Sequence, residues 1–346
     1  MQLPNIVRRL FLGVFLIAAI STVLLLSDLG RREGAGAGRS KKQSIYFIQL
    51  NNVSDVEEAD RGVRDVIRGA GFKEHRDFEI TVLNAQGDMA SLPSLIDSAI
   101  SSGADMLVTF STPTLQAALR RAGKNPIIFT YVANAVIAGA GRSNEDHLPN
   151  VTGTNAVFDF DNIIRVLKLV FPNLKKVGTL FVPAEVNMVY FKDQLAAACK
   201  KAGIELDAMG AATSSEVGEA AAALCSRHID VLCQIPGNLT ASSFPSIVHA
   251  ANQVSVPILG TQKAHGDQGA IIVAASDWYN LGTESGGMVV RVMKGESPAH
   301  IPFSSLKMQK LYVNLEAAKK VGATIPASLL SQATLIHGKE AAGGNH

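Results

Sequence analysis

The sequence has few cysteines and no excess of charge of either sign, and each of these two features argues against a class of protein. Three cysteines in 346 residues do not suggest a disulfide framework, and the apolar surroundings of Cys199, Cys225 and Cys233 favour buried thiols. The 32 basic and 30 acidic residues are mixed along the chain, apart from a basic cluster near the N-terminus. We therefore expect no nucleic-acid partner.

The sequence also lacks the motifs of common catalytic sites. It contains neither the Gly-x-x-x-x-Gly-Lys-Ser/Thr pattern for nucleotide phosphates nor a Gly-x-Ser-x-Gly elbow. The eight histidines form no pair with metal-ligand spacing among themselves or with a cysteine. Asp159 and Asp161 are paired carboxylates, but they stand at an expected helix start, where acidic caps are common. No enzymatic activity, metal or cofactor is expected.

The N-terminal region has the pattern of an export signal. Arg8 and Arg9 precede a mostly apolar run at 10–26, and a polar stretch rich in Gly, Ala, Arg and Lys follows at 27–44. No cysteine lies near it, which argues against a lipid anchor. We expect residues 1–43 to be a signal peptide or a signal anchor with a flexible linker. This predicts a periplasmic protein, tethered to the inner membrane if the segment is retained.

From residue 45 onward, short apolar runs alternate with segments of helical period. The length and the 47% hydrophobic content predict two lobes. Expected strands lie at 45–50, 78–83, 105–110 and 126–132, and, after a Gly-rich interval at 138–150, at 176–182, 204–209, 229–235, 257–259 and 269–275. Repeated strand–helix order of this kind predicts an α/β protein with two doubly wound, Rossmann-like lobes.

Polar residues follow many of these strands. Because ligands of open α/β sheets bind beyond the carboxyl ends of the strands, we take these residues as candidates for ligand binding. They are Asn51, Asn52, Ser111, Thr112, Asn134, Asn187, Gly237, Asn238 and Asp277. Their hydroxyl and amide groups suit hydrogen bonding rather than catalysis. Each of the asparagines, taken alone, is also an ordinary turn residue.

The segment Ser111-Thr112-Pro113 joins the strand at 105–110 to a helical pattern. Proline suits the first turn of a helix, so we expect Thr112 to be the N-cap. A strand that leads directly into a helix presents free N–H groups and the positive end of the helix dipole, which attract a carboxylate or phosphate. The alternative is that both hydroxyls serve only to cap the helix.

Several segments, in order, resemble a known family. They are DRGVRDVIRGAGF (60–72), LNAQGD (83–88), TFSTPTLQAA (109–118), PIIFTYVANA (126–135), NVTGT (150–154), VPAEVN (182–187), VLCQIPGN (231–238), SDWYNLG (276–282) and IPFSSLKMQKLYVNLEAAKKVGATIP (301–326). Over residues 44–335 the chain resembles the extracytoplasmic substrate-binding proteins of ABC transporters, in the subfamily that includes tryptophan-binding members.

The resemblance implies a type I periplasmic-binding fold, in which three segments cross between the lobes and a small ligand is held in the cleft for an ABC permease. It implies a first lobe of 44–154 and 272–302, a second lobe of 155–271 and 303–335, and a disordered tail at 336–346. In the family the hydroxyl residue before the proline contacts the ligand's carboxylate, which here would be Ser111 or Thr112.

Two positions depart from the family's pattern. Relatives often carry Asp-Pro where this chain has Asn134-Ala135, and Asp-Asn where it has Gly237-Asn238. Carboxylates suit a ligand's ammonium group, so with both of them replaced Asp277 remains as a candidate anionic partner, and the identity of the ligand is left open.

The leading hypothesis is a solute receptor that closes on its ligand by a hinge. A membrane-tethered ligand sensor acting through a signalling partner is the alternative, and an exported enzyme on the same fold is the third.

Overall fold

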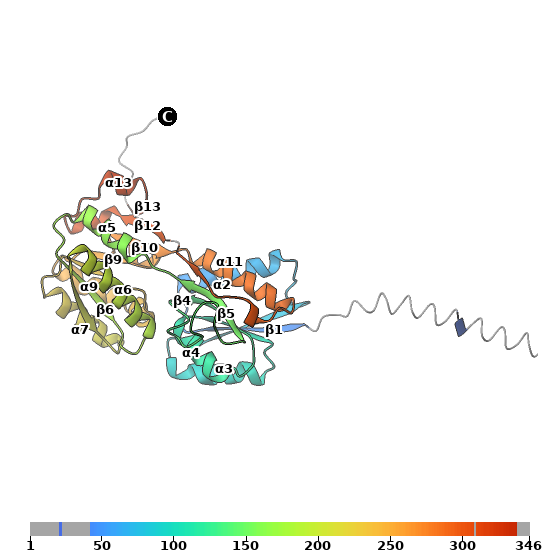
Figure 1. The fold of residues 1–346 in the computed structure, drawn as a ribbon. Helices are drawn as coiled ribbons and strands as arrows, with labels where there is room; N and C mark the ends of the chain where they lie inside the picture. Colours follow the sequence, from blue (N-terminus) through green and yellow to red (C-terminus); the bar gives the residue numbers. More distant parts are fainter. Residues whose placement is uncertain (1–20, 23–41, 308, 338–346) are drawn as a thin grey trace, which may run out of the picture. The chain divides into compact units, whose positions relative to one another are not determined.

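The computed structural model describes residues 21–22, 42–307 and 309–337 of the chain, which divides into the units Met1–Lys42 and Gln43–His346. The expected signal or anchor segment at 10–26 lies outside the described residues except for positions 21–22. Among the residues that are described, no helix is both long and apolar enough to cross a membrane. The second unit contains two β-sheets with their helices (Figure 1).

The first sheet has six strands, and all of its neighbouring strands are parallel. Its order is β11 (Ser304–Leu306), β5 (Val151–Ala156), β4 (Ile127–Val132), β3 (Met106–Phe110), β1 (Gln43–Gln49) and β2 (Phe78–Asn84). Central strand β3 is buried along its whole length, because helices cover both faces of a parallel sheet. This explains why its sequence is a continuous apolar run.

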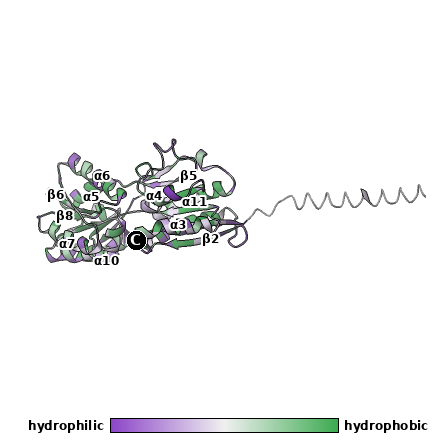
Figure 2. Ribbon diagram, turned by 90° about the horizontal axis from the view of Figure 1, so that it is seen from below, coloured by the Kyte–Doolittle hydropathy of each residue, from purple (hydrophilic) through white to green (hydrophobic). Residues whose placement is uncertain are grey.

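Four long helices cover this first sheet. Helices α2 (Ser54–Gly69) and α11 (Trp278–Met293) lie on one face, and α3 (Leu92–Ser101) and α4 (Thr112–Arg121) lie on the other (Figure 1). Short 3₁₀ turns, Met89–Ser91 and Pro298–His300, complete the covering. Figure 2 shows hydrophobic residues along the strands and the helix faces that meet them, which form the core of this half.

The second sheet has seven strands, and only the pair β10–β12 is antiparallel. Its order is β13 (Thr334–His337), β12 (Gln309–Asn314), β10 (Ile272–Ser276), β9 (Ile258–Gly260), β8 (Val231–Cys233), β6 (Lys176–Phe181) and β7 (Glu205–Gly210). Strand β13 extends to His337, into the expected tail, and residues 338–346 lie outside the described part of the chain.

The helices of the second half also form two groups. Helix α5 (Phe160–Val170) packs with α6 (Val186–Ala202), and α7 (Ser214–Cys225) packs with α9 (Phe244–Gln253). Shorter helices are α8 (Asn238–Ser242), α10 (Lys263–Gln268), α12 (Leu315–Lys320) and α13 (Ala327–Leu330). Cys199, Cys225 and Cys233 are free and buried, as predicted, and burial raises the pKa of each thiol.

The chain passes between the two halves three times: between β5 and α5, between β10 and α11, and between β11 and β12. Two ion pairs join these segments, Asp159 Oδ2 with Lys307 Nζ at 2.7 Å and Asp277 Oδ2 with Lys310 Nζ at 2.6 Å. The three crossings and the two doubly wound sheets are those of a type I periplasmic-binding fold.

The strands near the crossings differ from the expected division. The strand at 272–276 belongs to the seven-stranded sheet, whereas we expected residues 272–302 in the first lobe. The strand at 304–306 belongs to the six-stranded sheet, although we expected it in the second lobe. In both cases the chain first adds one more strand to the sheet of one half and only then crosses to the other half, a few residues later than expected.

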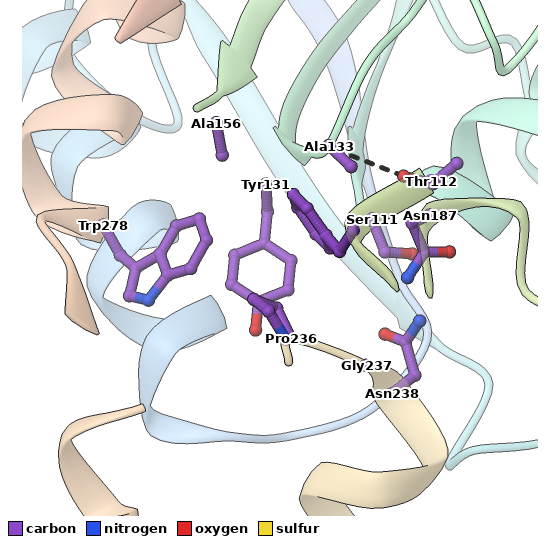
Figure 3. Close-up of a pocket in the computed structure, with 11 residues that line it drawn as sticks. Ser111, Thr112, Tyr131, Ala133, Ala156, Asn187, Pro236, Gly237, Asn238 and Trp278 are labelled. Atoms are coloured by element: carbon purple, nitrogen blue, oxygen red, sulfur yellow. Dashed lines mark hydrogen bonds between the residues drawn. The ribbon is translucent and has the colours of Figure 1, made fainter. Parts of the chain in front are cut away.

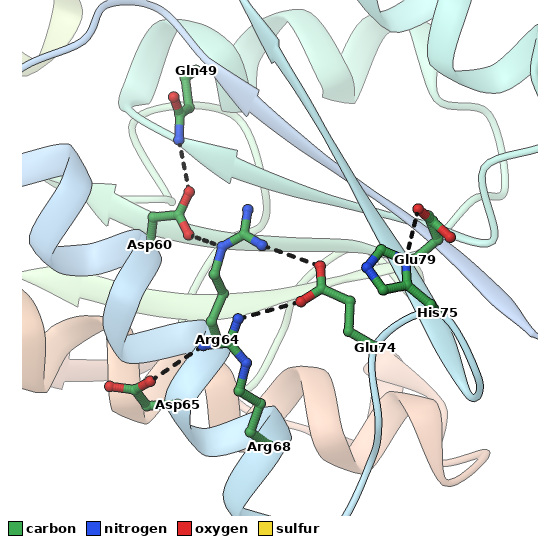
Figure 4. A network of polar contacts seen from close by, with 8 residues as sticks. All are labelled: Gln49, Asp60, Arg64, Asp65, Arg68, Glu74, His75 and Glu79. Atoms are coloured by element: carbon green, nitrogen blue, oxygen red, sulfur yellow. Dashed lines mark hydrogen bonds and ion pairs between the residues drawn. The ribbon is translucent and has the colours of Figure 1, made fainter.

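Helix α2 is fixed to its surroundings in two ways. Against α11 the backbones touch, and a Cβ on Gly282 would lie 2.1 Å from the carbonyl oxygen of Ala59. On its other side Arg64 pairs with Asp60 and with Glu74, the latter at 3.4 Å between Nη1 and Oε1 (Figure 4). This network links α2 to the segment before β2 and so fixes the position of the helix.

Candidate functional site

A small cavity lies between the two sheets, at the carboxyl ends of their strands (Figure 3). Its free volume is about 30 Å³. Its lining comes from both halves of the fold and consists of Ser111, Thr112, Tyr131, Ala133, Ala156, Asn187, Phe191, Pro236, Gly237, Asn238 and Trp278. Five of the nine residues predicted from the sequence are among them: Ser111, Thr112, Asn187, Gly237 and Asn238.

The other four predicted residues do not line this cavity. Asn134 Oδ1 accepts hydrogen bonds from the N–H groups of Val136 and Ile137 and so stabilises a turn. Asp277 caps helix α11 and pairs with Lys310. Asn51 and Asn52 follow β1 at the surface of the loop before α2.

At the start of α4, the structure corrects the expected cap. The N-cap is Ser111, whose Oγ accepts a hydrogen bond from the Thr114 N–H at 3.3 Å, and Thr112 is the first helical residue. Thr112 Oγ1 instead accepts a hydrogen bond from the Ala133 N–H at 3.3 Å. Thr112 therefore links the loop after β3 to the loop after β4, and its hydroxyl hydrogen is left for another acceptor.

The Ser111 backbone has an unusual conformation. Its φ of 144° is in a region that residues other than glycine rarely adopt. Tyr131, which also lines the cavity, has a φ of 57°. Such conformations persist where the surrounding structure fixes them, and they gather at ligand sites.

On the opposite side of the cavity, Glu185 organises two asparagines. Glu185 is buried, and its Oε2 accepts hydrogen bonds from Nδ2 of Asn187 at 3.3 Å and Nδ2 of Asn238 at 2.7 Å. Because a carboxylate accepts hydrogen bonds, both amides must turn their nitrogens toward Glu185. Their oxygens are thereby left for other donors, and Asn187 Oδ1 has no hydrogen-bond partner among the described residues.

One end of the cavity is aromatic. The rings of Tyr131 and Trp278 lie 4.3 Å apart between centroids, and Phe158 lies between Trp278 and Phe191, at 6.1 and 5.2 Å from them. Tyr131 Oη accepts a hydrogen bond from Gln262 Nε2 at 3.0 Å, which links the six-stranded half to the seven-stranded half. Burial raises the pKa of the Tyr131 phenol well above its ordinary value, so the group is neutral.

Beside this aromatic end lies a second buried carboxylate, Asp55, in the first turn of α2. Burial, and secondarily the neighbouring Glu58, raises the pKa of Asp55 to about 7. The nearby Trp278 indole partly offsets that shift, although neither its Nε1 nor Asp55 Oδ2 has a partner within hydrogen-bond geometry among the described residues.

Three residues in or beside this site were not predicted from the sequence: Glu185, Asp55 and Tyr131. Glu185 stands inside the VPAEVN segment, but nothing in the segment distinguishes it from an exposed glutamate. Asp55 has the position of an ordinary acidic residue in a helix's first turn. Tyr131 belongs to an apolar strand, and its positive φ leaves no signal in the sequence.

The described residues contain no group of three or more His, Cys, Asp or Glu side chains placed to hold a metal ion. The site is instead a set of hydrogen-bonding groups facing an aromatic wall, which suits binding of a small organic solute.

Comparison with known proteins agrees with this description. The chain is 30% identical over 311 residues to a tyrosine-binding protein of Clostridioides difficile. The aligned region covers 88% of this chain and 90% of that protein. A conserved domain protein from Vibrio cholerae superposes with a TM-score of 0.81 at 27% identity, over 85% of this chain and 99% of that one.

The fold is also that of an ABC domain from Streptococcus pneumoniae solved in complex with L-tryptophan, with a TM-score of 0.82 at 24% identity over 86% of this chain and 100% of that one. Residues 48–336 match a family of proteins that bind small molecules outside the cytoplasm, work with ABC transporter components and are not enzymes. On this match and the shared fold, the chain belongs to the family of ABC transporter substrate binding proteins.

Proposed function

We propose that this receptor binds an amino-acid-like solute, with the ligand's carboxylate at Ser111 and Thr112 and its ammonium group at Asn238 and Asn187. The observation that supports this most directly is the arrangement of opposite polar groups across one cavity. Hydroxyls at a helix start face one side, and amides held by a buried carboxylate face the other.

The proposed site for the ligand's carboxylate is the start of α4. This helix begins at Thr112, and the positive end of its dipole favours a negative charge. Ser111 and Thr112 are each 2% exposed, so their hydroxyls have little access to water. A carboxylate would accept the Thr112 hydroxyl hydrogen in a charge-assisted hydrogen bond.

The proposed site for the ligand's ammonium group depends on the negative charge of Glu185. Among the residues that the structure describes, this buried carboxylate accepts hydrogen bonds only from neutral N–H groups, those of Asn187, Asn238 and Leu239. A buried negative charge is stabilised by a nearby cation. The amide oxygens of Asn187 and Asn238 can accept from an ammonium group while Glu185 supplies the opposite charge behind them. This replaces the carboxylates that relatives often carry at other positions.

The relative from Clostridioides difficile supports an amino acid as the ligand class, since it is named for binding tyrosine. Calorimetric titration of the purified full chain with a panel of amino acids and their deaminated analogues tests the proposal. We expect alanine to bind at least about tenfold more tightly than lactate, because one charged hydrogen-bonding group is lost. Equal binding of the two, or binding of neither by a protein that retains another solute on purification, would contradict it.

We further propose ABC permease subunits as partners, and attachment to the inner membrane through the apolar segment at 10–26. A retained segment of this kind holds the full chain in the membrane fraction through a salt wash, while a protein that starts near Lys42 is released. A mature N-terminus at or after Gly38 in the exported protein would contradict the attachment and leave a free periplasmic receptor.

A further inference from the structure

Two of the large side chains that line the cavity occupy space in it together. The ring of Tyr131 lies with its centroid 4.3 Å from that of Trp278, at an interplanar angle of 46°. Figure 3 shows the Tyr131 ring in the middle of the labelled residues, between Trp278 and the polar group formed by Ser111, Asn187 and Asn238. A ring in this place separates the aromatic wall from the polar end of the site.

The position of Tyr131 is fixed from two directions. Its backbone φ of 57° points the side chain away from the course of an ordinary strand, and the register between β4 and β5 shifts between Phe129 and Val132. At the other end, Gln262 of the seven-stranded half donates a hydrogen bond to its phenol oxygen. An aromatic residue with positive φ is uncommon, which indicates that this placement is a specific feature.

The free volume beside the Tyr131 ring is small. The cavity's 30 Å³ has room for about two water molecules, at roughly 10 to 15 Å³ each. Ala133 and Ala156, which also line it, contribute only methyl groups. While the Tyr131 ring lies against Trp278, an aromatic side chain of a ligand cannot stack on that face of the indole.

We propose that Tyr131 determines the size of the ligand's side chain, by occupying the place where the ring of an aromatic amino acid would stack on Trp278. The receptor then selects amino acids with small side chains, such as glycine, alanine and serine. This inference rests on the proposed function, because it assumes that the polar groups hold the ligand's carboxylate and ammonium.

The test compares the full chain with three variants by calorimetric titration against alanine, serine, phenylalanine and tyrosine. Tyr131→Ala removes the ring. Tyr131→Phe keeps the ring and removes the hydrogen bond to Gln262. Tyr46→Ala removes the same atoms from a half-buried position on β1 that does not line the cavity. Thermal unfolding confirms that each variant is folded.

We expect the unaltered protein to prefer alanine to tyrosine, since forcing a ring into a filled site costs binding energy. Tyr131→Ala should raise the affinity for tyrosine roughly ten- to a hundredfold, and Tyr131→Phe should leave the preference for alanine in place. Tyr46→Ala should leave the affinities for alanine and for tyrosine unchanged.

Two results would overturn this inference and leave the proposed function intact. One is that tyrosine binds the unaltered protein as tightly as alanine does, and the other is that Tyr131→Ala weakens the binding of tyrosine. The second would show that Tyr131 is a wall on which the ligand's ring stacks. If neither the unaltered protein nor any variant binds an amino acid, the proposed function fails, and this inference fails with it.

Discussion

Glu185 holds Asn238 by two hydrogen bonds, from the backbone N–H at 3.1 Å and from Nδ2 at 2.7 Å, both to its Oε2. Glu185 is 1% exposed and belongs to the turn before α6, whereas Asn238 begins α8. One carboxylate thus fixes the separation of two strand-end loops and the direction in which the Asn238 amide oxygen faces.

This relationship predicts that Glu185 determines affinity for the ligand's ammonium group. Glu185→Gln keeps the shape of the side chain and removes its charge, so affinity for the preferred amino acid should fall roughly ten- to a hundredfold, the loss typical of a hydrogen bond to a charged group. Affinity for the deaminated analogue should change much less. Calorimetric titration with both ligands measures the difference.

The matched control is Glu216→Gln. Glu216 Oε2 also accepts a backbone N–H, from Ala212 at 2.8 Å, but at the exposed start of α7 and away from the cavity. This variant should leave both affinities unchanged. A uniform loss with both ligands in Glu185→Gln would mean that the carboxylate only maintains the loops.

Helix packing provides a second prediction. Gly282→Ala places a Cβ 2.1 Å from the Ala59 carbonyl oxygen, so α11 and α2 must separate, and the free energy of unfolding should fall by about 1 to 3 kcal/mol. Gly287 belongs to the same helix and has nothing within 4 Å of its added Cβ. Gly287→Ala should therefore raise the free energy of unfolding by about 0.5 to 1 kcal/mol.

Urea unfolding of the two variants measures both changes. Their opposite signs are the distinguishing result, because helix propensity alone favours alanine at both positions. Equal stabilisation by the two substitutions would show that the helices can move apart at little cost.

The buried Asp55 predicts a pH dependence of stability. Its pKa is raised from 3.8 to about 7, so the folded state binds a proton that the unfolded state has lost over that range. The free energy of unfolding therefore falls as pH rises from about 4 to about 7 and then stays lowered, by an amount on the order of 1 to 4 kcal/mol. Asp55→Asn removes this dependence.

The comparison must be made as a difference between proteins, because another buried group acts in the opposite direction. Burial lowers the pKa of His265 from 6.5 to about 3, so its contribution to stability is lost as pH falls through that range. Urea unfolding of the unaltered protein and of Asp55→Asn at pH 5 and pH 8 cancels the histidine term. We expect the free energy of unfolding of Asp55→Asn, relative to that of the unaltered protein, to be higher at pH 8 than at pH 5. The same relative value at both pH values would show that Asp55 does not titrate between them.

The sequence was sufficient for the βα order, because strands buried on both faces are continuous apolar runs and the helices between them have a clear period. It was also sufficient to find the polar residues at Ser111, Thr112, Asn187 and Asn238, since a strand end is recognisable where an apolar run stops. The burial of a carboxylate is not recognisable in this way. Glu185 and Asp55 are buried by residues distant in sequence, which only the folded chain brings to them.

Sequence position also did not separate residues that line the cavity from residues that stabilise the fold. Asp277 was a candidate for the ligand's anionic partner, and in the structure its Oδ1 accepts from the Asn280 N–H and its Oδ2 pairs with Lys310. Lys310 follows Asp277 by more than thirty positions and reaches it through the antiparallel pairing of β10 with β12, which places Lys310 opposite Ala275. That strand was not among those expected.

The last prediction concerns the start of α4. Thr112→Val keeps the side chain's shape, removes the hydroxyl that would donate to the ligand, and leaves the Ala133 N–H without its acceptor. Affinity for the amino acid should fall roughly ten- to a hundredfold, and the free energy of unfolding should fall by about 1 kcal/mol.

The control is Thr213→Val, because Thr213 Oγ1 caps α7 by accepting from the Glu216 N–H at 3.3 Å and does not line the cavity. Loss of that cap should lower stability by about 1 kcal/mol and leave affinity unchanged. Calorimetric titration and urea unfolding of both variants separate the two roles, since a purely structural Thr112 would behave as Thr213 does, with stability lowered and affinity intact.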